Sequence, residues 1–530
     1  MKTLLLTILA ILTAELLLAQ PTPEWTSSIG ANLIGTPKIK FDNSGDLIAV
    51  GTIGNDATGK DISIIKYSPS GSIIWQHLFN GVSNGDDLAN DFEIDIQNNI
   101  IITGSSAINP ENADLIAIRY YADGTFHWLN SFDGVLNKED AGKAISIDQT
   151  GASYVTGFTT TDSLEFEFIQ RIVTTKIDSL GNTVWTRFFG TDTLAQYNGE
   201  KIKIINNEIR ILASYQSENP FFVVLKYDTS GTLLFSNEVP VARPVGCFYL
   251  DDFNNSYLGF GGWERFKIIK ANSIGNIVWS KTIPTNMPSN WTGDEARAII
   301  VDSLQNVYVT GRHYGDDFNG PTYSNADIMT VKYNSGGSQL WSKRYEYLGN
   351  NAADITNTIT LDKNLNVYVA GESQKTVAGT NYDYIVVKYS NNGNEIGTIR
   401  YNDTTNGNAF ITSIIVDDSS NIYVTGSVSS SITTQKYSSV SGVGIFELND
   451  KQISINAFPN PFTNITSIYF PNSDNATFDF QLSDFSGKII LKQKTKSDKI
   501  EVSADLTPGL YMFTLFSDKR GYNGKIIKTE

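Results

Sequence analysis

Residues 298–311 read AIIVDSLQNVYVTG, and residues 326–345, after an intervening loop, read ADIMTVKYNSGGSQLWSKRY. Apolar and polar residues alternate in four short runs within these segments, and turns rich in Asp, Asn, Ser and Gly separate the runs. Alternation with a period of two residues is typical of β-strands, and such turns are typical of hairpins. We therefore expect four antiparallel strands in Ala298–Tyr345.

Three landmarks of this stretch recur along most of the chain. The first is an Asp turn followed by a strand that ends in Gly, as in Asp302 to Gly311. The second is a basic residue followed by Tyr, as in Lys332-Tyr333, and the third is an aromatic residue in the fourth run, Trp341. Successive basic positions are separated by about 53 residues, which leaves room for four strands of about six residues with their loops. A repeat of four-stranded units predicts an all-β propeller.

We count eight copies, two of which (residues 202–239 and 246–283) lack the Thr-Gly signature. The last copy is incomplete, because after Lys436-Tyr437 the chain enters a Ser- and Gly-rich segment without a fourth strand. The missing strand resembles residues 24–30, EWTSSIG, at the other end of the chain. We therefore expect an eight-bladed propeller (seven blades remain possible) over residues 21–440, closed by an N-terminal strand.

Composition narrows the classes of function. The net charge of −16 argues against a general binder of nucleic acid or anionic membranes, since both need a basic surface. A single cysteine, Cys247, excludes an intramolecular disulfide and a cysteine metal cage. Residues 1–20, with Lys2 before the apolar run Leu4–Leu18, predict a cleaved secretory signal peptide, and no second stretch is long enough to predict a transmembrane segment.

The composition changes after residue 440. Residues 441–452 are predicted to be a linker, and the repeat is absent from residues 453–530. This region opens with Pro459-Asn460-Pro461 and continues with short strands, which predicts a small C-terminal β-sandwich.

Two family resemblances follow from these motifs. The repeat resembles the bacterial β-propeller repeat family, whose members read roughly as Asp…Asn-Val-Tyr-Val-Thr-Gly…Lys-Tyr…Gly…Trp. That family is often named for seven blades and implies no single activity. The C-terminal region resembles the type A sorting domain of the type IX (Por) secretion system of Bacteroidetes. The residues that carry this second resemblance are Pro459, Asn460, Pro461, Gly487, Gly509, Tyr511 and Lys525.

The second resemblance implies a route and a partner. It implies export through the inner membrane, recognition of the folded C-terminal domain by the outer-membrane machinery, and a protein that is secreted or held on the outer cell surface. Pro-Asn-Pro fits a rigid entry turn, and Gly487 and Gly509 fit tight turns at strand starts. The alternative is that these residues have only a structural role in the C-terminal domain.

One recurring acid is a candidate for binding. In four copies an Asp stands eight residues before the landmark Asp, where the chain passes from one blade to the next; these are Asp87, Asp140, Asp294 and Asp354. At the channel mouth of a propeller such carboxylates could hold a cation or a polar ligand, or supply acid and base groups. A residue repeated in blade after blade is more often a structural device that hydrogen-bonds a neighbouring loop.

Other candidates are weaker. Gly81–Gly85 fits the G-x-S-x-G pattern but lies in a loop between predicted strands, whereas a nucleophile elbow needs a strand-to-helix turn. The three histidines, His77, His127 and His313, show no metal-ligand spacing. We therefore predict no catalytic residue, metal or cofactor, and a secreted binding or scaffold protein for an extracellular glycan or protein. The alternative is a hydrolase or lyase that acts on extracellular polysaccharide through carboxylates at the channel mouth.

Overall fold

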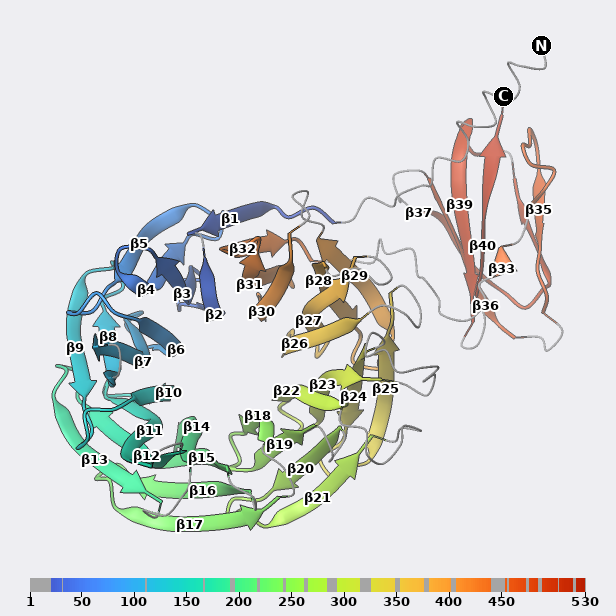
Figure 1. Cartoon of the computed structure of the whole chain (residues 1–530). Helices are drawn as coiled ribbons and strands as arrows, with labels where there is room; N and C mark the ends of the chain where they lie inside the picture. The colour runs from blue at the N-terminus through green and yellow to red at the C-terminus, as the bar shows by residue number, and fades with distance from the viewer. Residues whose placement is uncertain are drawn as a thin grey trace. The chain divides into compact units, whose positions relative to one another are not determined.

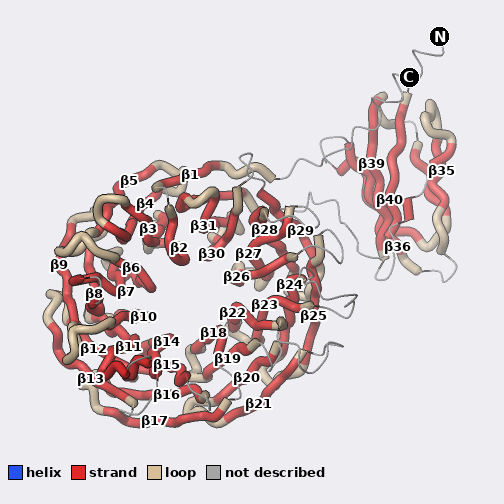
Figure 2. The backbone as a smooth tube through the Cα atoms, viewed as in Figure 1, coloured by secondary structure: helices blue, strands red, loops and turns tan. Residues whose placement is uncertain are grey.

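The structure is a computed structural model, and its chain divides into two compact units, Met1–Val440 and Ser441–Glu530. Figure 2 shows that the described residues form strands and loops. The ranges that the structure describes are 21–30, 32–109, 112–164, 167–190, 196–216, 220–241, 245–261, 266–283, 293–314, 326–347, 353–375, 381–401, 407–439, 453–454, 457–472, 476–484, 489–503, 505–517 and 521–529. The predicted signal peptide and linker lie outside these ranges.

The first unit is built from antiparallel meanders of four strands, which we call blades, arranged radially with the first strand of each innermost (Figure 1). The innermost strands are β2 (Leu33–Phe41), β6 (Asp87–Ile94), β10 (Asp140–Ile147), β14 (Gln196–Ile205), β18 (Val245–Leu250), β22 (Glu295–Val301), β26 (Asp354–Leu361) and β30 (Ala409–Val416). The second strands are β3 (Leu47–Asn55), β7 (Ile100–Asn109), β11 (Ser153–Leu164), β15 (Glu208–Gln216), β19 (Ser256–Phe260), β23 (Val307–His313), β27 (Val367–Gln374) and β31 (Ile422–Val428).

Two further strands complete each meander. The third strands are β4 (Gly59–Tyr67), β8 (Asn112–Tyr120), β12 (Glu167–Ile177), β16 (Phe221–Asp228), β20 (Lys267–Ala271), β24 (Asp327–Tyr333), β28 (Tyr382–Tyr389) and β32 (Ser431–Tyr437). The outermost strands are β5 (Ile73–Phe79), β9 (Phe126–Phe132), β13 (Thr183–Phe189), β17 (Leu233–Pro240), β21 (Ile277–Thr282), β25 (Gln339–Tyr345), β29 (Glu395–Tyr401) and β1 (Trp25–Ile29).

Strand pairing joins the two ends of this unit. The sheet of β30, β31 and β32 receives its fourth strand from the start of the chain, because β1 pairs with β32 and places Trp25 opposite Lys436. One sheet is larger than the others: β10–β13 and β14–β17 are joined by a single parallel bridge between Gln170 and Gln196. The strand that we expected from residues 24–30 therefore pairs with the incomplete last copy.

The core lies between neighbouring blades. One cluster of buried side chains joins Ile64 of β4 to Phe92 of β6, and another joins Ile39 of β2 to Tyr423 of β31. The middle strands are covered by a blade on each side, so β4 is buried continuously from Asp61 to Tyr67. This double burial explains why the middle strands contain longer apolar runs than the outermost ones.

The recurrent tryptophan, which is absent from β17 and β29, links a blade to the next. The Trp341 indole N–H donates to the carbonyl of Asn391, 3.0 Å away in the next blade, and its ring covers Gly393, whose φ of 83° favours glycine. Trp25 makes the same contact with the β2–β5 blade, since its N–H donates to Pro69 O at 3.3 Å. The third landmark of the repeat is thus an interlock between blades.

A β-bulge explains the Gly of the Thr-Gly landmark. The register of β26 against β27 shifts between Thr356 and Thr358, which pushes the innermost strand toward Gly371. A Cβ atom at Gly371 would lie 2.7 Å from the Cα of Thr356, closer than real Cβ atoms approach. The same close approach of bulged backbone occurs at Gly104, Gly157, Gly311 and Gly426. Only glycine fits here because it lacks a Cβ.

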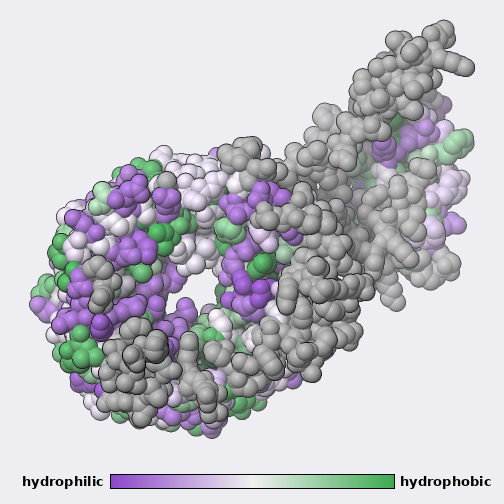
Figure 3. All heavy atoms as spheres, viewed as in Figure 1, coloured by the Kyte–Doolittle hydropathy of each residue, from purple (hydrophilic) through white to green (hydrophobic). Residues whose placement is uncertain are grey.

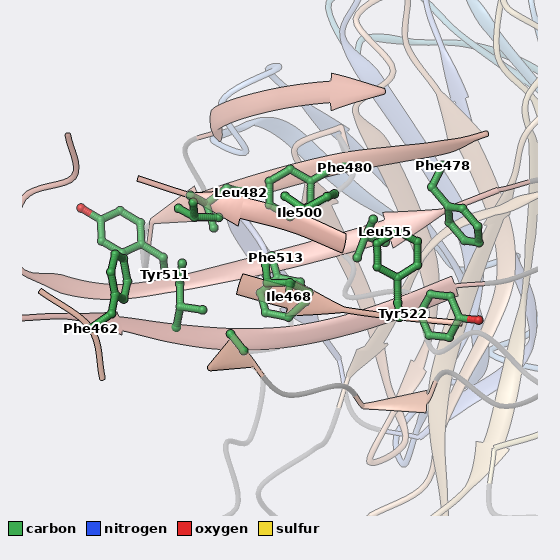
Figure 4. Close-up of a cluster of buried hydrophobic side chains, with 14 residues drawn as sticks. Phe462, Ile468, Phe478, Phe480, Leu482, Ile500, Tyr511, Phe513, Leu515 and Tyr522 are labelled. Atoms are coloured by element: carbon green, nitrogen blue, oxygen red, sulfur yellow. The ribbon is translucent and has the colours of Figure 1, made fainter. Parts of the chain in front are cut away.

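The second unit contains two sheets around one core. A five-stranded sheet has the order β33 (Ile453–Ser454), β40 (Gly521–Lys528), β39 (Gly509–Phe516), β36 (Phe478–Asp484) and β37 (Ile489–Thr495). A three-stranded sheet has the order β34 (Ala457–Phe458), β35 (Thr466–Tyr469) and β38 (Lys499–Val502). Figure 4 shows apolar side chains of both sheets, among them Ile468, Phe480 and Phe513, in this core.

The residues that the structure describes include no helix long and apolar enough to span a membrane.

Candidate functional site

The landmark polar residues of the repeat are used by the fold. Asp302 accepts hydrogen bonds at Oδ1 from the backbone N–H groups of Leu304 (2.9 Å) and Asn306 (2.8 Å), which closes the hairpin turn. Its Oδ2 accepts the Tyr308 hydroxyl at 3.0 Å, and the Lys332 ammonium lies 4.8 Å from the Tyr308 ring. These residues hold a blade together and leave little free polar capacity for a ligand.

The four candidate aspartates lie at the starts of innermost strands of four blades. Asp87, Asp140 and Asp354 begin β6, β10 and β26, Asp294 directly precedes β22, and all four are buried. Three of them accept a backbone N–H from the chain that leaves the outermost strand of the preceding blade: Gly81 donates to Asp87 (2.6 Å), Gly134 to Asp140 (2.6 Å) and Tyr347 to Asp354 (2.8 Å). These three anchor the connections between blades, whereas Asp294 accepts the Tyr314 N–H (2.9 Å) within its own blade.

Sequence reasoning missed a second set of buried acids. Asp61, Asp114, Asp327 and Asp383 stand at or near the starts of third strands, and all four are at most 6% exposed. Their signal is their spacing, five residues before the basic landmark, as Asp61 stands before Lys66. Three of them interact electrostatically with an aspartate at the start of the next blade: Asp61 with Asp87, Asp114 with Asp140, and Asp327 with Asp354.

Burial changes the acidity of these groups. It raises the pKa of Asp114 to about 6, and the charges of Asp133 and Asp140 add to the rise. Burial also raises the pKa of Asp327 to about 7, although the Arg344 guanidinium opposes the rise. Burial likewise raises the pKa of Asp354 to about 6. These shifts mark paired carboxylates in a low-dielectric setting.

A group of charged side chains on the innermost strands was also missed. Figure 3 shows hydrophilic side chains around the central opening of the ring. Lys38 of β2 forms an ion pair with Asp91 of β6 at 2.8 Å, and Lys40 forms one with Glu93 at 2.7 Å. Lys201 of β14 is exposed and forms no ion pair with a described residue. We call Lys38, Lys40, Asp91, Glu93 and Lys201 the channel cluster.

Charges act across this cluster. Burial works to raise the pKa of Asp91, but the charges of Lys38, Lys40 and Lys201 outweigh it and lower that pKa. Although Lys201 is exposed to solvent, the protein atoms around it lower its pKa by desolvation and Lys38 lowers it further, while Asp91 and Glu200 oppose the shift. Asp91 is therefore an anion among lysines, and Lys201 is the cation that is free to meet another anion.

The channel cluster has a local structural origin. Lys38, Asp91 and Lys201 are each the first paired residue after the bulge of an innermost strand. Other blades carry Ala144, Cys247, Ala298, Thr358 and Ser413 at this position. The only signal in the sequence is a charged residue at one position of the repeat, and that position can be identified only when the location of the bulge is known.

The remaining candidates have structural partners. The ring of His77 stacks on Tyr120 at 5.5 Å, and that of His127 on Tyr121 at 4.3 Å, while buried His313 lies 3.3 Å from Asp294. Ser83 lies in the loop between β5 and β6 and donates to the carbonyl of Ala107. In the described part of the chain, no three His, Cys, Asp or Glu side chains come together as metal ligands.

The entry motif of the second unit is tied to β40. The Asn460 side chain donates to Lys525 O at 2.8 Å and accepts from the Ile527 N–H at 2.7 Å. Phe462 continues this docking, because its N–H donates to Ile527 O at 2.9 Å. Residues 459–462, from the start of the unit, thus lie against its last strand.

Three other motif residues have different roles. The Tyr511 hydroxyl donates to Thr507 O at 2.8 Å and is buried, whereas Lys525 is exposed. Gly509 begins β39, and a Cβ there would meet no atom closer than 3.9 Å, so no steric reason requires glycine. Gly487 lies outside the described residues.

Comparisons with known proteins bear on both units. Residues 340–376 match a family model described as a beta-propeller repeat, and residues 456–529 match one described as a secretion system C-terminal sorting domain. No curated protein matches the chain.

Solved structures resemble the fold at very low identity. Sqt1 from Chaetomium thermophilum has 8% identity and a TM-score of 0.50, over 79% of this chain and 99% of Sqt1. The WD40 domain of SCAP from fission yeast has 8% identity and a TM-score of 0.40, over 79% of this chain and 98% of that one. PorZ of Porphyromonas gingivalis, described as an essential surface component of the type-IX secretion system, has 10% identity and a TM-score of 0.21, over 94% of this chain and 100% of that one. Only the first score reaches 0.5, and at 8% identity it bears on the fold alone.

The radial four-stranded blades and the two family matches agree with each other. The chain therefore carries β-propeller repeats followed by a C-terminal sorting domain of the type IX secretion system.

Proposed function

We propose that this protein is a binding or scaffold module of the cell surface or the secreted fraction, and that its propeller is a closed ring of eight blades over residues 21–440. Closure is supported by contacts between the last and first blades. Thr412 of β30 donates to Pro37 O at 2.6 Å, and the Ile39 N–H donates to the Ser413 hydroxyl at 3.3 Å. With β1 as its outermost strand, the last blade then has the same four strands as the others.

The binding role rests on one observation. The channel cluster is charged, lies on innermost strands and departs from the repeat, whereas the periodic polar residues are engaged by the fold. Lys201 offers an ammonium group without an ion-pair partner among the described residues, beside the paired Lys38 and Asp91. Such an arrangement suits an anionic group, for instance the carboxylate of an acidic glycan or of a protein side chain.

This role can be tested with the secreted protein. Binding to a panel of acidic and neutral glycans should favour acidic ones, and Lys201→Ala should weaken that binding at least tenfold. Lys343→Ala, on the outermost strand β25, is the control and should leave binding unchanged. Turnover of a glycan that Asp91→Asn abolishes would instead establish the hydrolase or lyase alternative.

Export is tested separately. We propose that residues 1–20 direct passage across the inner membrane, that residues 441–452 link the units, and that residues 453–530 are read by the type IX machinery. Deletion of residues 453–530 should leave the propeller in the periplasm. Normal surface display or secretion of the truncated protein would contradict the sorting role.

A further inference from the structure

Two buried carboxylates meet where the β2–β5 blade contacts the β6–β9 blade. Asp61 lies in the third strand β4 and is 2% exposed, and Asp87 begins β6 and is 0% exposed. Ile62, the residue after Asp61, lies opposite Phe79 of β5, and Gly81, two residues after Phe79, donates its N–H to Asp87 at 2.6 Å, so both carboxylates lie at the same end of this blade. Burial raises the pKa of Asp87, and the charge of Asp61 raises it further. Two adjacent buried anions are costly unless a positive charge lies between them.

The bonds that these carboxylates already make leave one oxygen of Asp61 unused and one oxygen of Asp87 with only the Ser106 hydroxyl near it. Asp61 accepts the Asn55 amide (2.9 Å) and the Thr58 hydroxyl (2.8 Å), both at Oδ2. Asp87 accepts the Gly81 N–H at Oδ2, with the Ser106 hydroxyl also beside the carboxylate. The Oδ1 atoms of both acids are buried and have no well-formed hydrogen bond with any described residue.

In two other blades an arginine is paired with the acid equivalent to Asp61. In the β22–β25 blade the equivalent acid, Asp327, is paired with Arg344 of the outermost strand. In the β26–β29 blade Asp383 is paired with Arg400 at 3.0 Å, again from the outermost strand. The chain thus supplies a cation of its own to two of these carboxylates.

The first two blades lack that arginine. Arg344 lies opposite Met329, three positions after Trp341, and Arg400 occupies the same register position opposite Ile385. The residue at this position is Leu78, opposite Ser63, in the β2–β5 blade, and Ser131, opposite Ile116, in the β6–β9 blade. No described Lys or Arg forms an ion pair with Asp61, Asp87, Asp114 or Asp140.

We propose that a Ca²⁺ ion takes the place of the missing arginine between Asp61 and Asp87, and that a second ion binds between Asp114 and Asp140. The second site resembles the first on one side only: Asp114 Oδ1 and the neighbouring Asn112 Oδ1 are buried without a partner in the described chain, whereas Asp140 Oδ1 accepts the Thr160 N–H at 3.1 Å. All available ligands are carboxylate, hydroxyl, amide and backbone oxygens, which suit Ca²⁺ and not a metal that prefers nitrogen or sulfur. With two carboxylates a site, we expect dissociation constants of about 10⁻⁴–10⁻³ M, as in other extracellular calcium modules.

The test is thermal unfolding and calcium binding of the purified full-length secreted protein at pH 7.5. Calcium at 5 mM should raise the melting temperature by several degrees over the value in EDTA, and equilibrium dialysis should find two ions a chain. The double variant Asp61→Asn/Asp114→Asn should lose both effects. Leu78→Arg should raise stability in EDTA and bind one ion fewer, because it restores the arginine of the later blades.

The control is Leu129→Arg. Leu129 is exposed on β9 and does not occupy the strand position of Arg344 and Arg400, so this variant should still bind two ions. The proposal is overturned if dialysis finds no calcium, or if the double variant binds as much as the parent. It is also overturned if Leu78→Arg leaves the number of bound ions unchanged. A gain in stability on acidification without any response to calcium would mean that a shared proton fills the site instead.

Discussion

The glycine that closes the second strand of a blade gives the sharpest test of how the repeat specifies the fold. In Gly371→Ala the new methyl carbon would lie 2.7 Å from the Cα of Thr356 and 2.9 Å from the carbonyl carbon of Ile355. Carbon atoms normally approach to about 3.5–4.0 Å, so the overlap is about 0.8 Å. These two atoms and the carbonyl oxygen of Ile355, which lies closer still, all belong to backbone and cannot be moved by changing a rotamer.

The surroundings leave the bulge little room to relax. Thr356 and its neighbours in β26 pair with β27 on one side, and Asn357 in the bulge donates to Ile411 O of the next blade at 3.1 Å. A shift of β26 would therefore disturb the contact between two blades. By analogy with overpacked cores, we expect Gly371→Ala to lower the free energy of unfolding by about 3 kcal/mol.

The assay is urea unfolding followed by tryptophan fluorescence, with Gly336→Ala as the matched control. Gly336 lies in a turn of the β22–β25 blade, where an added Cβ would have its nearest neighbour at 3.5 Å, so this change should stay within about 0.5 kcal/mol of the parent. Equal stability of Gly371→Ala and the parent would refute the reasoning, because the bulge would then tolerate a side chain.

Three other predictions concern the ring closure, the buried acids and the sorting domain. The hydroxyls of Ser28 and Thr433 are 3.0 Å apart, so Ser28→Cys/Thr433→Cys should form a disulfide on oxidation and stabilise the ring by about 2–4 kcal/mol; absence of the cross-link on non-reducing gels would count against closure through β1. Burial and two neighbouring carboxylates raise the pKa of Asp114 to about 6, so the stability from its protonation is complete below about pH 4 and is lost as the pH rises through 6. In EDTA, Asp114→Asn should therefore raise the unfolding free energy at pH 8 by on the order of 2 kcal/mol and flatten the pH profile, and an unchanged profile would contradict this assignment. In the sorting domain, Gly509→Ala should leave stability within about 0.5 kcal/mol while Asn460→Ala should lower it by about 2 kcal/mol, so an export defect in the first variant alone would mark recognition apart from folding.

The repeat made the blades predictable because each landmark solves a problem that every blade has. Asp302 closes a hairpin, Trp341 covers the turn of the next blade, and Gly371 admits a bulged strand. These needs recur with the period of the fold, so a single sequence displays them many times. The pairing of β1 with β32 was predictable for the same reason, since the two ends of the chain carry complementary fragments of one repeat.

The channel cluster was not predictable from the same pattern. The bulge of an innermost strand removes one residue from the alternation, so residues after it change face relative to a regular strand. Without the bulge, Asp91 is one polar residue among several in residues 87–95, and nothing in the sequence places it beside Lys38 of another blade. The sequence singled out Asp87 but not its pairing with Asp61, because 26 residues separate two groups that meet across a blade interface.

Periodic and aperiodic residues therefore carry different information in this protein. The same position after the bulge holds Ala144 in one blade and Lys201 in the next, so the ring imposes no charge there. Ala144 is buried in the core between blades, whereas the charge of Lys201 acts on Asp91 of β6. Because the repeat requires no charge at this position, Lys201 is the residue on which the proposed binding function rests. The landmarks that define the repeat therefore report on the fold, and the departures from it are the residues to test for binding.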